Sequence, residues 1–230
     1  MTIITALDQI FSFIPKLELE RFKKEGLYQP ILSGQAKNAS DFYDHLNRAQ
    51  CQWPRINYYY LAKPMKTWLL PGLTLQIGSG NGELLFQLYQ QGQKLLYGLD
   101  CSPAMIRLAR QRIKPFSIRL IKDKAENIKN IKLLPLKNII IHNFWGLMPK
   151  SSSIKLLLEL KNKLLPHGQI IIGPVTKSIP TNLRLAAEKI LSQELGFNFS
   201  YPQFHHFSQL GYHSQIIKIS GLNYYLLKKP

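Results

Sequence analysis

A short glycine-rich loop, residues 78–82 with the sequence GSGNG, lies between an apolar run and an amphipathic segment. Glycine is required in such a loop where a Cβ would block a ligand or where φ must be positive. A strand, a glycine loop and a helix in this order let a ligand sit against the N-terminus of the helix. The pattern therefore predicts a site for a nucleotide-like ligand.

The spacing of the glycines separates the ligands that use such loops. A P-loop ends in Gly-Lys-Ser/Thr, whereas Gly82 is followed by Glu83 and Leu84. A dinucleotide loop follows G-x-G-x-x-G, and counted from Gly78 its last position is Glu83, so the third glycine comes one residue early. An acidic side chain at the helix start would also repel a pyrophosphate. A zwitterionic ligand that carries adenosine fits this loop best.

An aspartate stands at the end of the next apolar run. Asp100 comes eighteen residues after Gly82, where its carboxylate can accept hydrogen bonds from both hydroxyls of a ribose. The alternative is a turn aspartate that caps the following helix. Ser102 as N-cap and Pro103 at the first helical position already provide that cap, which favours the ribose role.

Short apolar runs alternate with amphipathic stretches around these residues, which indicates βαβ units and a parallel sheet. The runs 214–220 and 223–228, joined by Gly221 and Leu222, predict a closing antiparallel hairpin. The other expected strands are 73–77, 94–100, 118–122, 136–141 and 169–173. The expected helices are 82–91, one that starts at 102, one over 153–165 with Ser153 as its N-cap, and one over 181–196 with Thr181 as its N-cap.

The pattern of the chain changes at residues 70–72. Before them the chain reads as helical segments with aromatic residues and few β-branched runs. A chain of 230 residues is long enough for one sizeable α/β domain with an appendage. We therefore expect an N-terminal helical cap or lid over residues 1–70 and a main domain over residues 71–230.

Two further stretches, 97–105 (YGLDCSPAM) and 164–171 (LLPHGQII), accompany the glycine loop. With them the chain resembles the class I S-adenosylmethionine-dependent methyltransferases, especially those with a small-molecule or quinone-type acceptor. The resemblance runs motif by motif from Trp68 to Ile172. It implies an α/β, Rossmann-like fold with a seven-stranded, mostly parallel sheet, an antiparallel last strand and helices on both faces, here with the N-terminal helical cap added.

The resemblance also implies S-adenosylmethionine as the cofactor and S-adenosylhomocysteine as the product. The glycines would contact the methionine part, Asp100 the ribose, and the residues that follow Asp100 would lie near the adenine. The cofactor-binding residues implied in this way are Gly78, Ser79, Gly80, Gly82, Asp100, Cys101, Ser102, Met105, Asp123, Ala125 and His142.

The chain departs from the family pattern at three acidic positions. Gln76 stands two residues before the first glycine, where an acid is usual, and Asn138 stands at the start of the fourth expected strand. After the third strand, Lys124 takes the place of the expected Asp if Ala125 occupies the usual alanine position. Gln76 and Asn138 still form hydrogen bonds but bring no negative charge. Two interpretations remain open: a working enzyme, or a methyltransferase-like protein that is catalytically silent.

Ligands in open α/β sheets bind beyond the carboxyl ends of the strands, which points to the segment from His142 onward. His142 is the candidate for a base or a contact to the methyl acceptor, and its alternative role is a strand-end histidine bonded to backbone. The spacing of the histidines predicts no metal site. The candidate residues for the acceptor pocket are Tyr58, Phe144, Trp145, His205 and His206.

The chain carries thirty Lys and Arg against thirteen Asp and Glu, a net charge of +17. Such a surface attracts polyanions such as RNA, anionic lipid or an acidic carrier protein, although lysines spread over solvated faces give the same total. Cys51 and Cys101 show no metal or disulfide spacing, which predicts a reducing, cytoplasmic location. No apolar run approaches the roughly 20 residues that span a bilayer.

Three functions follow from these features. The leading hypothesis is methyl transfer to N or O of a small-molecule acceptor, as in a biosynthetic reaction. The second is methylation of RNA, motivated by the basic surface. Amino-methylating nucleic-acid enzymes, however, carry Asp/Asn-Pro-Pro-Tyr/Phe after the fourth strand, whereas residues 143–146 read NFWG. The third is a silent binding protein that keeps the fold.

Overall fold

The computed structural model describes residues 58–142, 150–174 and 204–230, together with residues 4, 8, 20, 23, 24, 32, 33 and 44. The chain divides into two compact units, residues 1–56 with 177–199, and residues 57–176 with 200–230. The helices and strands named below belong to the second unit. Phe144, Trp145 and the helix expected over 181–196 lie outside the described residues.

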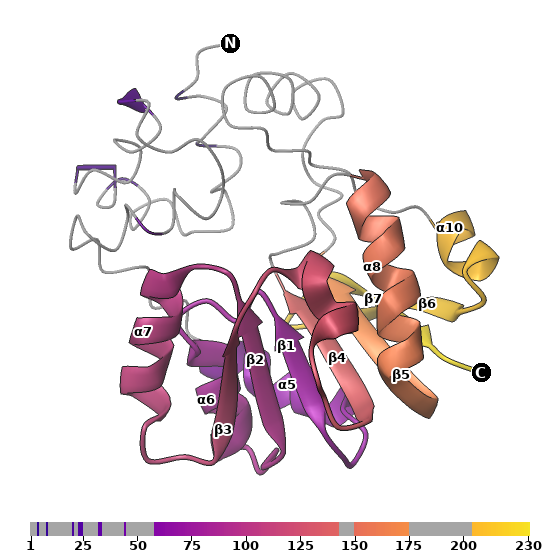
Figure 1. Cartoon of the computed structure of the whole chain (residues 1–230), viewed down its shortest axis with the longest axis horizontal. Helices are drawn as coiled ribbons and strands as arrows, with labels where there is room; N and C mark the ends of the chain where they lie inside the picture. The colour runs from indigo at the N-terminus through magenta and orange to yellow at the C-terminus, as the bar shows by residue number, and fades with distance from the viewer. Residues whose placement is uncertain are drawn as a thin grey trace. The chain divides into compact units, whose positions relative to one another are not determined.

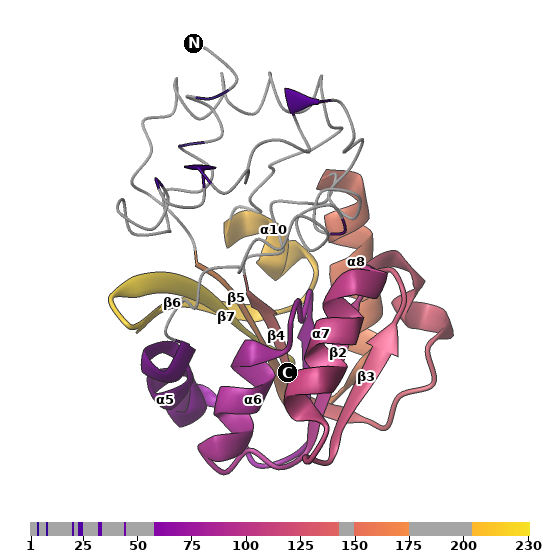
Figure 2. The same cartoon turned by 90° about the vertical axis from the view of Figure 1, so that its left-hand side faces the viewer.

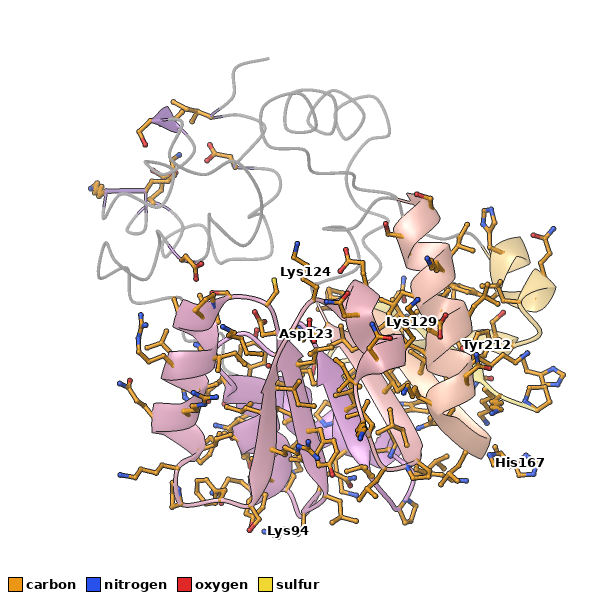
Figure 3. All side chains as sticks on the ribbon, in the orientation of Figure 1. Lys94, Asp123, Lys124, Lys129, His167 and Tyr212 are labelled. Carbon is orange, nitrogen blue, oxygen red and sulfur yellow. The ribbon has the colours of Figure 1, made fainter. Side chains whose placement is uncertain are left out.

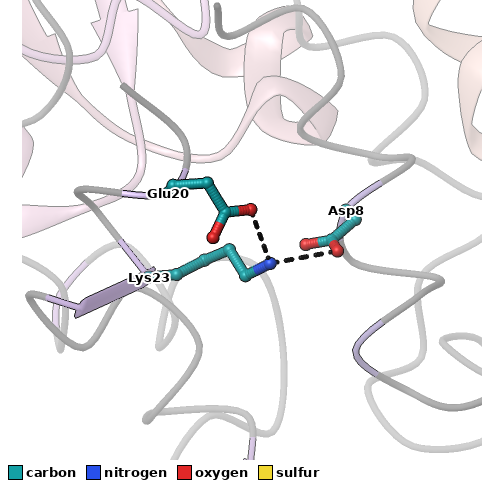
Figure 4. Close-up of polar contacts among 3 residues, drawn as sticks. All are labelled: Asp8, Glu20 and Lys23. Atoms are coloured by element: carbon teal, nitrogen blue, oxygen red, sulfur yellow. Dashed lines mark hydrogen bonds and ion pairs between the residues drawn. The ribbon is translucent and has the colours of Figure 1, made fainter. Parts of the chain in front are cut away.

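The described part of the first unit contains a small ion-pair cluster (Figure 4). The Lys23 ammonium lies 3.0 Å from a carboxylate oxygen of Glu20 and 3.1 Å from one of Asp8. The hydrogen bond with Glu20, followed by that with Asp8, raises the pKa of Lys23. Because these side chains are partly exposed, solvent screens the pairs and they contribute little to stability.

The second unit is built on a seven-stranded sheet with the order β3-β2-β1-β4-β5-β7-β6 (Figure 1). Neighbours among β1 to β5 are parallel, whereas β7 runs antiparallel to both β5 and β6. The predicted sheet and its antiparallel last strand are confirmed. The strands are β1 Thr74–Ile77, β2 Leu96–Asp100, β3 Ile118–Lys122, β4 Leu136–His142, β5 Leu164–Gly173, β6 His213–Ile219 and β7 Leu222–Lys228.

Helices cover both faces of this sheet. On one face α5 and α6 pack over a shared core, and α7 follows α6 along the same side (Figure 2). On the other face α8, the short 3-10 helix η1 and α10 pack over a second core. Central parallel strands covered on both faces read as continuous apolar runs, as in β4. The helices are α5 Tyr58–Trp68, α6 Glu83–Gln90, α7 Pro103–Ile113, η1 Ala125–Asn130, α8 Lys150–Lys163 and α10 Phe204–Gln209.

Some boundaries differ from those expected. α8 is already helical at Lys150, so Ser153 is a buried residue inside the helix and the prediction of an N-cap there is wrong. The closing hairpin is confirmed, with its turn at Ser220 and Gly221, both at positive φ. α5 belongs to the second unit because its apolar side, which includes Met65, is buried in the core shared with α6.

A buried hydrogen-bond network ties the loop after α5 to the amino ends of the central strands. The side chain of Asn138 accepts a hydrogen bond from the amide of Leu70 at 2.9 Å and donates one to its carbonyl at 2.8 Å. Asn138 also donates to Thr74 Oγ1 at 3.0 Å and accepts from Gln169 at 3.0 Å. Gln169 donates in addition to the carbonyl of Trp68.

This network explains why an asparagine lies near the amino end of β4. A carboxylate cannot donate, so an aspartate would place one of its oxygens against the carbonyl of Leu70. Asn138 pairs with Thr74 at the amino end of β1, whereas the glycine loop follows the carboxyl end of that strand. The residue that departs from the family pattern here therefore holds the fold.

Replacing Asn138 by Ala is expected to lower the free energy of unfolding by about 2–4 kcal/mol, because several buried partners lose their hydrogen bonds. Asn138→Asp should destabilise the protein at neutral pH as well, since it removes the donor to Leu70. Urea unfolding gives both values, with Asn130→Ala as the exposed control. Equal midpoints for Asn138→Ala and the control would show that the network is not stabilising.

Candidate functional site

The three glycines of the loop 78–82 all have positive φ, but the structure needs them for different reasons. Their φ values are 68° at Gly78, 52° at Gly80 and 75° at Gly82. A Cβ at Gly82 would lie 3.0 Å from the Cβ of Ala109, so this glycine lets α6 start against α7. A Cβ at Gly80 would meet nothing within 4 Å, so the backbone there borders open space. Gly80 is therefore the point where a ligand can approach the loop.

The carboxylate of Asp100, at the end of β2, holds the loop in place. One oxygen accepts a hydrogen bond from the Gly80 amide at 2.7 Å, and the other accepts one from the Ser102 amide at 2.9 Å. The hydroxyl of Ser102 accepts from the Met105 amide at 3.1 Å, which confirms the predicted N-cap of α7. The capping role of Ser102 therefore coexists with a turn role of Asp100. A carboxylate has about four lone-pair positions, and the two amides use only two of them. Asp100 can therefore still accept hydrogen bonds from a ribose, and that role stays a prediction.

A second clamp on the loop comes from α7 and was not predicted from the sequence. Arg112 donates from Nη1 to the carbonyl of Asn81 at 2.6 Å, and its Nε lies 2.8 Å from Glu83. Gln87 binds the other oxygen of Glu83 at 2.9 Å. Because the charge of Glu83 is balanced by Arg112, the acidic start of α6 is compatible with a ligand beside it.

His142 ends β4 inside a group of aromatic side chains. Its Nδ1 lies 3.1 Å from the hydroxyl of Tyr224, and the two rings are nearly parallel, with centroids 6.0 Å apart. The ring of Tyr58 meets His142 edge-on at 5.8 Å, so the structure brings together two residues predicted for the site. Burial lowers the pKa of His142 to about 4, so the imidazole is neutral at physiological pH. Burial also raises the pKa of Tyr58 to about 12.

Three buried polar atoms at this edge of the sheet have no hydrogen-bond partner among the described residues. They are Gln76 Oε1, Ser79 Oγ and His142 Nε2. Gln76 and Ser79 flank the carboxyl end of β1, and His142 ends the adjacent β4. Buried polar atoms are nearly always paired, so a cluster of unpaired ones calls for an explanation such as a bound ligand.

The residues predicted for the adenine side lie after β2 and β3. Met105 and Ala125 are buried and Cys101 is half-buried. Asp123 accepts hydrogen bonds from the Lys124 amide and from Asn127 Nδ2, each at 2.7 Å, so it organises the start of η1. The side chains of Asp123 and Lys124 lie near the carboxyl end of β3 (Figure 3), where Lys124 is exposed.

The other residues predicted for the acceptor pocket are His205, His206, Phe144 and Trp145. α10, which carries His205 and His206, packs through Phe207 into the core on the face opposite to α5 and α6. Phe144 and Trp145 lie outside the described residues. In the part of the chain that the structure describes, no group of three or more His, Cys, Asp or Glu side chains could hold a metal ion.

Comparisons with known proteins agree with this geometry. A family described as "Methyltransferase domain" matches residues 74–168. Among curated proteins, the chain is similar to "Uncharacterized methyltransferase YdaC" of Bacillus subtilis, with 29% identity over 99 residues, which are 43% of this chain and 53% of that protein. The matched segment thus spans about half the length of the relative.

Solved structures share the fold at low sequence identity. An O-methyltransferase family protein from Burkholderia thailandensis superposes with a TM-score of 0.61, at 12% identity, over 83% of this chain and 60% of its own. Human N-acetylserotonin methyltransferase in complex with S-adenosylmethionine gives 0.57, at 15% identity, over 83% and 56%. Magnesium protoporphyrin IX methyltransferase from Synechocystis with bound S-adenosylhomocysteine gives 0.54, at 17% identity, over 76% and 85%.

Replacing Asp100 by Ala is expected to speed hydrogen exchange of the Gly80 and Ser102 amides at least tenfold. Both amides lose a charged acceptor, which is worth about 1.5–3 kcal/mol each. Exchange followed by NMR or mass spectrometry measures the effect. Glu126→Ala, an exposed acid in η1, is the control. Unchanged exchange at Gly80 would show that Asp100 does not hold the loop.

The buried histidine should make the protein less stable in acid. Between pH 6.5 and about 4 the unfolded chain protonates His142 but the folded chain does not, so stability falls as the pH falls through this window. The loss is roughly 3 kcal/mol at the acid end. The free energy of unfolding of His142→Gln, compared with wild type from pH 4 to 8, should lack this part of the slope. If the unfolding free energies of the two proteins changed with pH in parallel, the pKa of His142 would not be lowered in the folded protein.

Proposed function

We propose that this chain, whose residues 74–168 form a class I S-adenosylmethionine-dependent methyltransferase domain, transfers a methyl group to N or O of a small-molecule acceptor. Its cofactor is S-adenosylmethionine. The observation that carries the proposal is the glycine loop, open at Gly80 and fixed by Asp100. A cytoplasmic location and a role in biosynthesis are parts of the same proposal.

The residues present fit this cofactor. Gly80 leaves space where a side chain would block the ligand, and Gln76 Oε1 and Ser79 Oγ are buried acceptor atoms suited to an ammonium group. Asp100 would accept from the ribose hydroxyls, and Met105 would form an apolar wall for the adenine. The bound cofactor supplies an electrophilic methyl group on a sulfonium.

The acceptor would lie beyond the end of β4. Tyr58 and Tyr224 enclose His142 in a buried aromatic environment, which suits an apolar small molecule better than a hydrated polymer. Methyl transfer from a sulfonium is a direct displacement, so alignment of the acceptor by these side chains supplies most of the rate. Proteins named for N-acetylserotonin and for magnesium protoporphyrin IX are among those similar in fold, which supports a small acceptor.

RNA methylation is the second hypothesis, but part of the basic charge has another use in the fold. Five lysines bind backbone carbonyls, several of them at helix ends, where a cation opposes the helix dipole. The lysines are Lys94, Lys137, Lys161, Lys163 and Lys229. A polyanion or acidic carrier as a partner stays a prediction.

Among the described residues, none of the helices has both the length and the apolar character of a membrane span.

Incubation of the purified chain with methyl-labelled S-adenosylmethionine, a metabolite extract and total RNA tests the proposal. Label is expected in the small-molecule fraction, and label only in RNA would favour the second hypothesis. His142→Ala should lower the turnover at least tenfold, because the proposal places His142 in contact with a bound ligand at the site of transfer. His213→Ala, an exposed histidine at the start of β6, should leave it unchanged. Absence of label in both fractions would support a silent binding protein.

A further inference from the structure

The hydrogen bond between Tyr224 and His142 decides which imidazole nitrogen carries the proton. The hydroxyl oxygen and Nδ1 are 3.1 Å apart, and either group could donate. A neutral imidazole has one N–H, so a donating tyrosine places that hydrogen on Nε2, and a donating Nδ1 leaves Nε2 as a lone pair. The first form binds an acceptor atom and the second binds a donor.

Burial of the tyrosine favours the first form. Tyr224 is fully buried, and Nδ1 of His142 is the acceptor within reach of its hydroxyl among the described residues. If Nδ1 donated instead, the phenol hydrogen would be buried without an acceptor, at a cost of about 1–3 kcal/mol. Burial also raises the pKa of Tyr224, so the phenol keeps its proton.

The surrounding chain fixes both rings. Gly173 in β5 pairs with His142 in register, and a Cβ there would lie 2.5 Å from Cδ1 of Tyr224, so only glycine leaves room for the tyrosine. The planes of the two rings differ by 14°, while Tyr58 from α5 meets His142 edge-on at 78°. Because Nδ1 is held by Tyr224, Nε2 lies on the side of the imidazole away from it.

We propose that Tyr224 is a positioning residue that keeps the hydrogen of His142 on Nε2, so that His142 donates a hydrogen bond to an oxygen of the bound ligand. His142 then orients the ligand and does not remove a proton from it. The inference deepens the proposed function, on which it rests. The oxygen belongs either to the cofactor's carboxylate or to the methyl acceptor.

Nitrogen NMR of the histidine ring in the full chain tests the proton position without any methyl transfer. The wild type is expected to show the hydrogen on Nε2 at neutral pH. Tyr224→Phe should give a mixture of both forms. Tyr212→Phe is the matched control, because it removes a buried phenol that donates to the Leu157 carbonyl at 2.8 Å on the opposite face. A hydrogen on Nδ1 in the wild type, or an unchanged ring in Tyr224→Phe, would overturn the proposal.

Two replacements of His142 test the donor. The amide of His142→Gln reaches the position of Nε2, whereas that of His142→Asn reaches only Nδ1. Gln should therefore keep ligand affinity or turnover within about threefold of wild type, and Asn should lose about tenfold, as expected for one hydrogen bond. Equal behaviour of Gln and Asn in every assay would overturn the donor role.

The source of the oxygen is read from two ligands. A loss in His142→Asn for S-adenosylhomocysteine, but not for 5′-methylthioadenosine, which lacks the amino-acid part, assigns the oxygen to the cofactor's carboxylate. Unchanged affinity for both with a tenfold lower turnover assigns it to the acceptor. Either result supports the proposal. If the wild type transfers no methyl group but its ring keeps the Nε2 hydrogen, the proposed function fails while the positioning role of Tyr224 stands.

Discussion

The site depends on one carboxylate, that of Asp100, which accepts a hydrogen bond from the glycine loop with one oxygen and from the start of α7 with the other. These bonds couple the carboxyl end of β2 to the loop that follows β1. Arg112 fixes the same loop from α7 through the carbonyl of Asn81. The loop thus keeps three residues at positive φ while one side of its backbone, at Gly80, stays open to a ligand.

Polar groups are divided between the two ends of the central strands. At the amino end, Asn138, Thr74 and Gln169 satisfy one another and the loop after α5. At the carboxyl end, atoms of Gln76, Ser79 and His142 remain unpaired among the described residues. Because an unpaired buried polar atom costs free energy, the first group stabilises the fold, and we propose that the second group meets a bound ligand. Of the departures from the family pattern, Asn138 belongs to the fold, and Gln76 belongs to the proposed site.

Local patterns predicted most of the sheet, the hairpin, the cap at Ser102 and the importance of the glycines, because each depends on neighbouring residues. The contacts that shape the site join residues far apart in the sequence, so no local sequence pattern predicts them. Arg112 reaches back to Asn81, and Tyr224 reaches His142 from the last strand. The prediction of an N-cap at Ser153 was wrong because the sequence alone does not distinguish a serine inside a helix from a serine at its start.

The central claim is that the loop held by Asp100 binds S-adenosylmethionine. Titration calorimetry of the full chain with S-adenosylmethionine and S-adenosylhomocysteine measures this directly, before any acceptor is known. A saturable heat is expected for both ligands, with one site per chain. No heat with either ligand at millimolar concentration would contradict it.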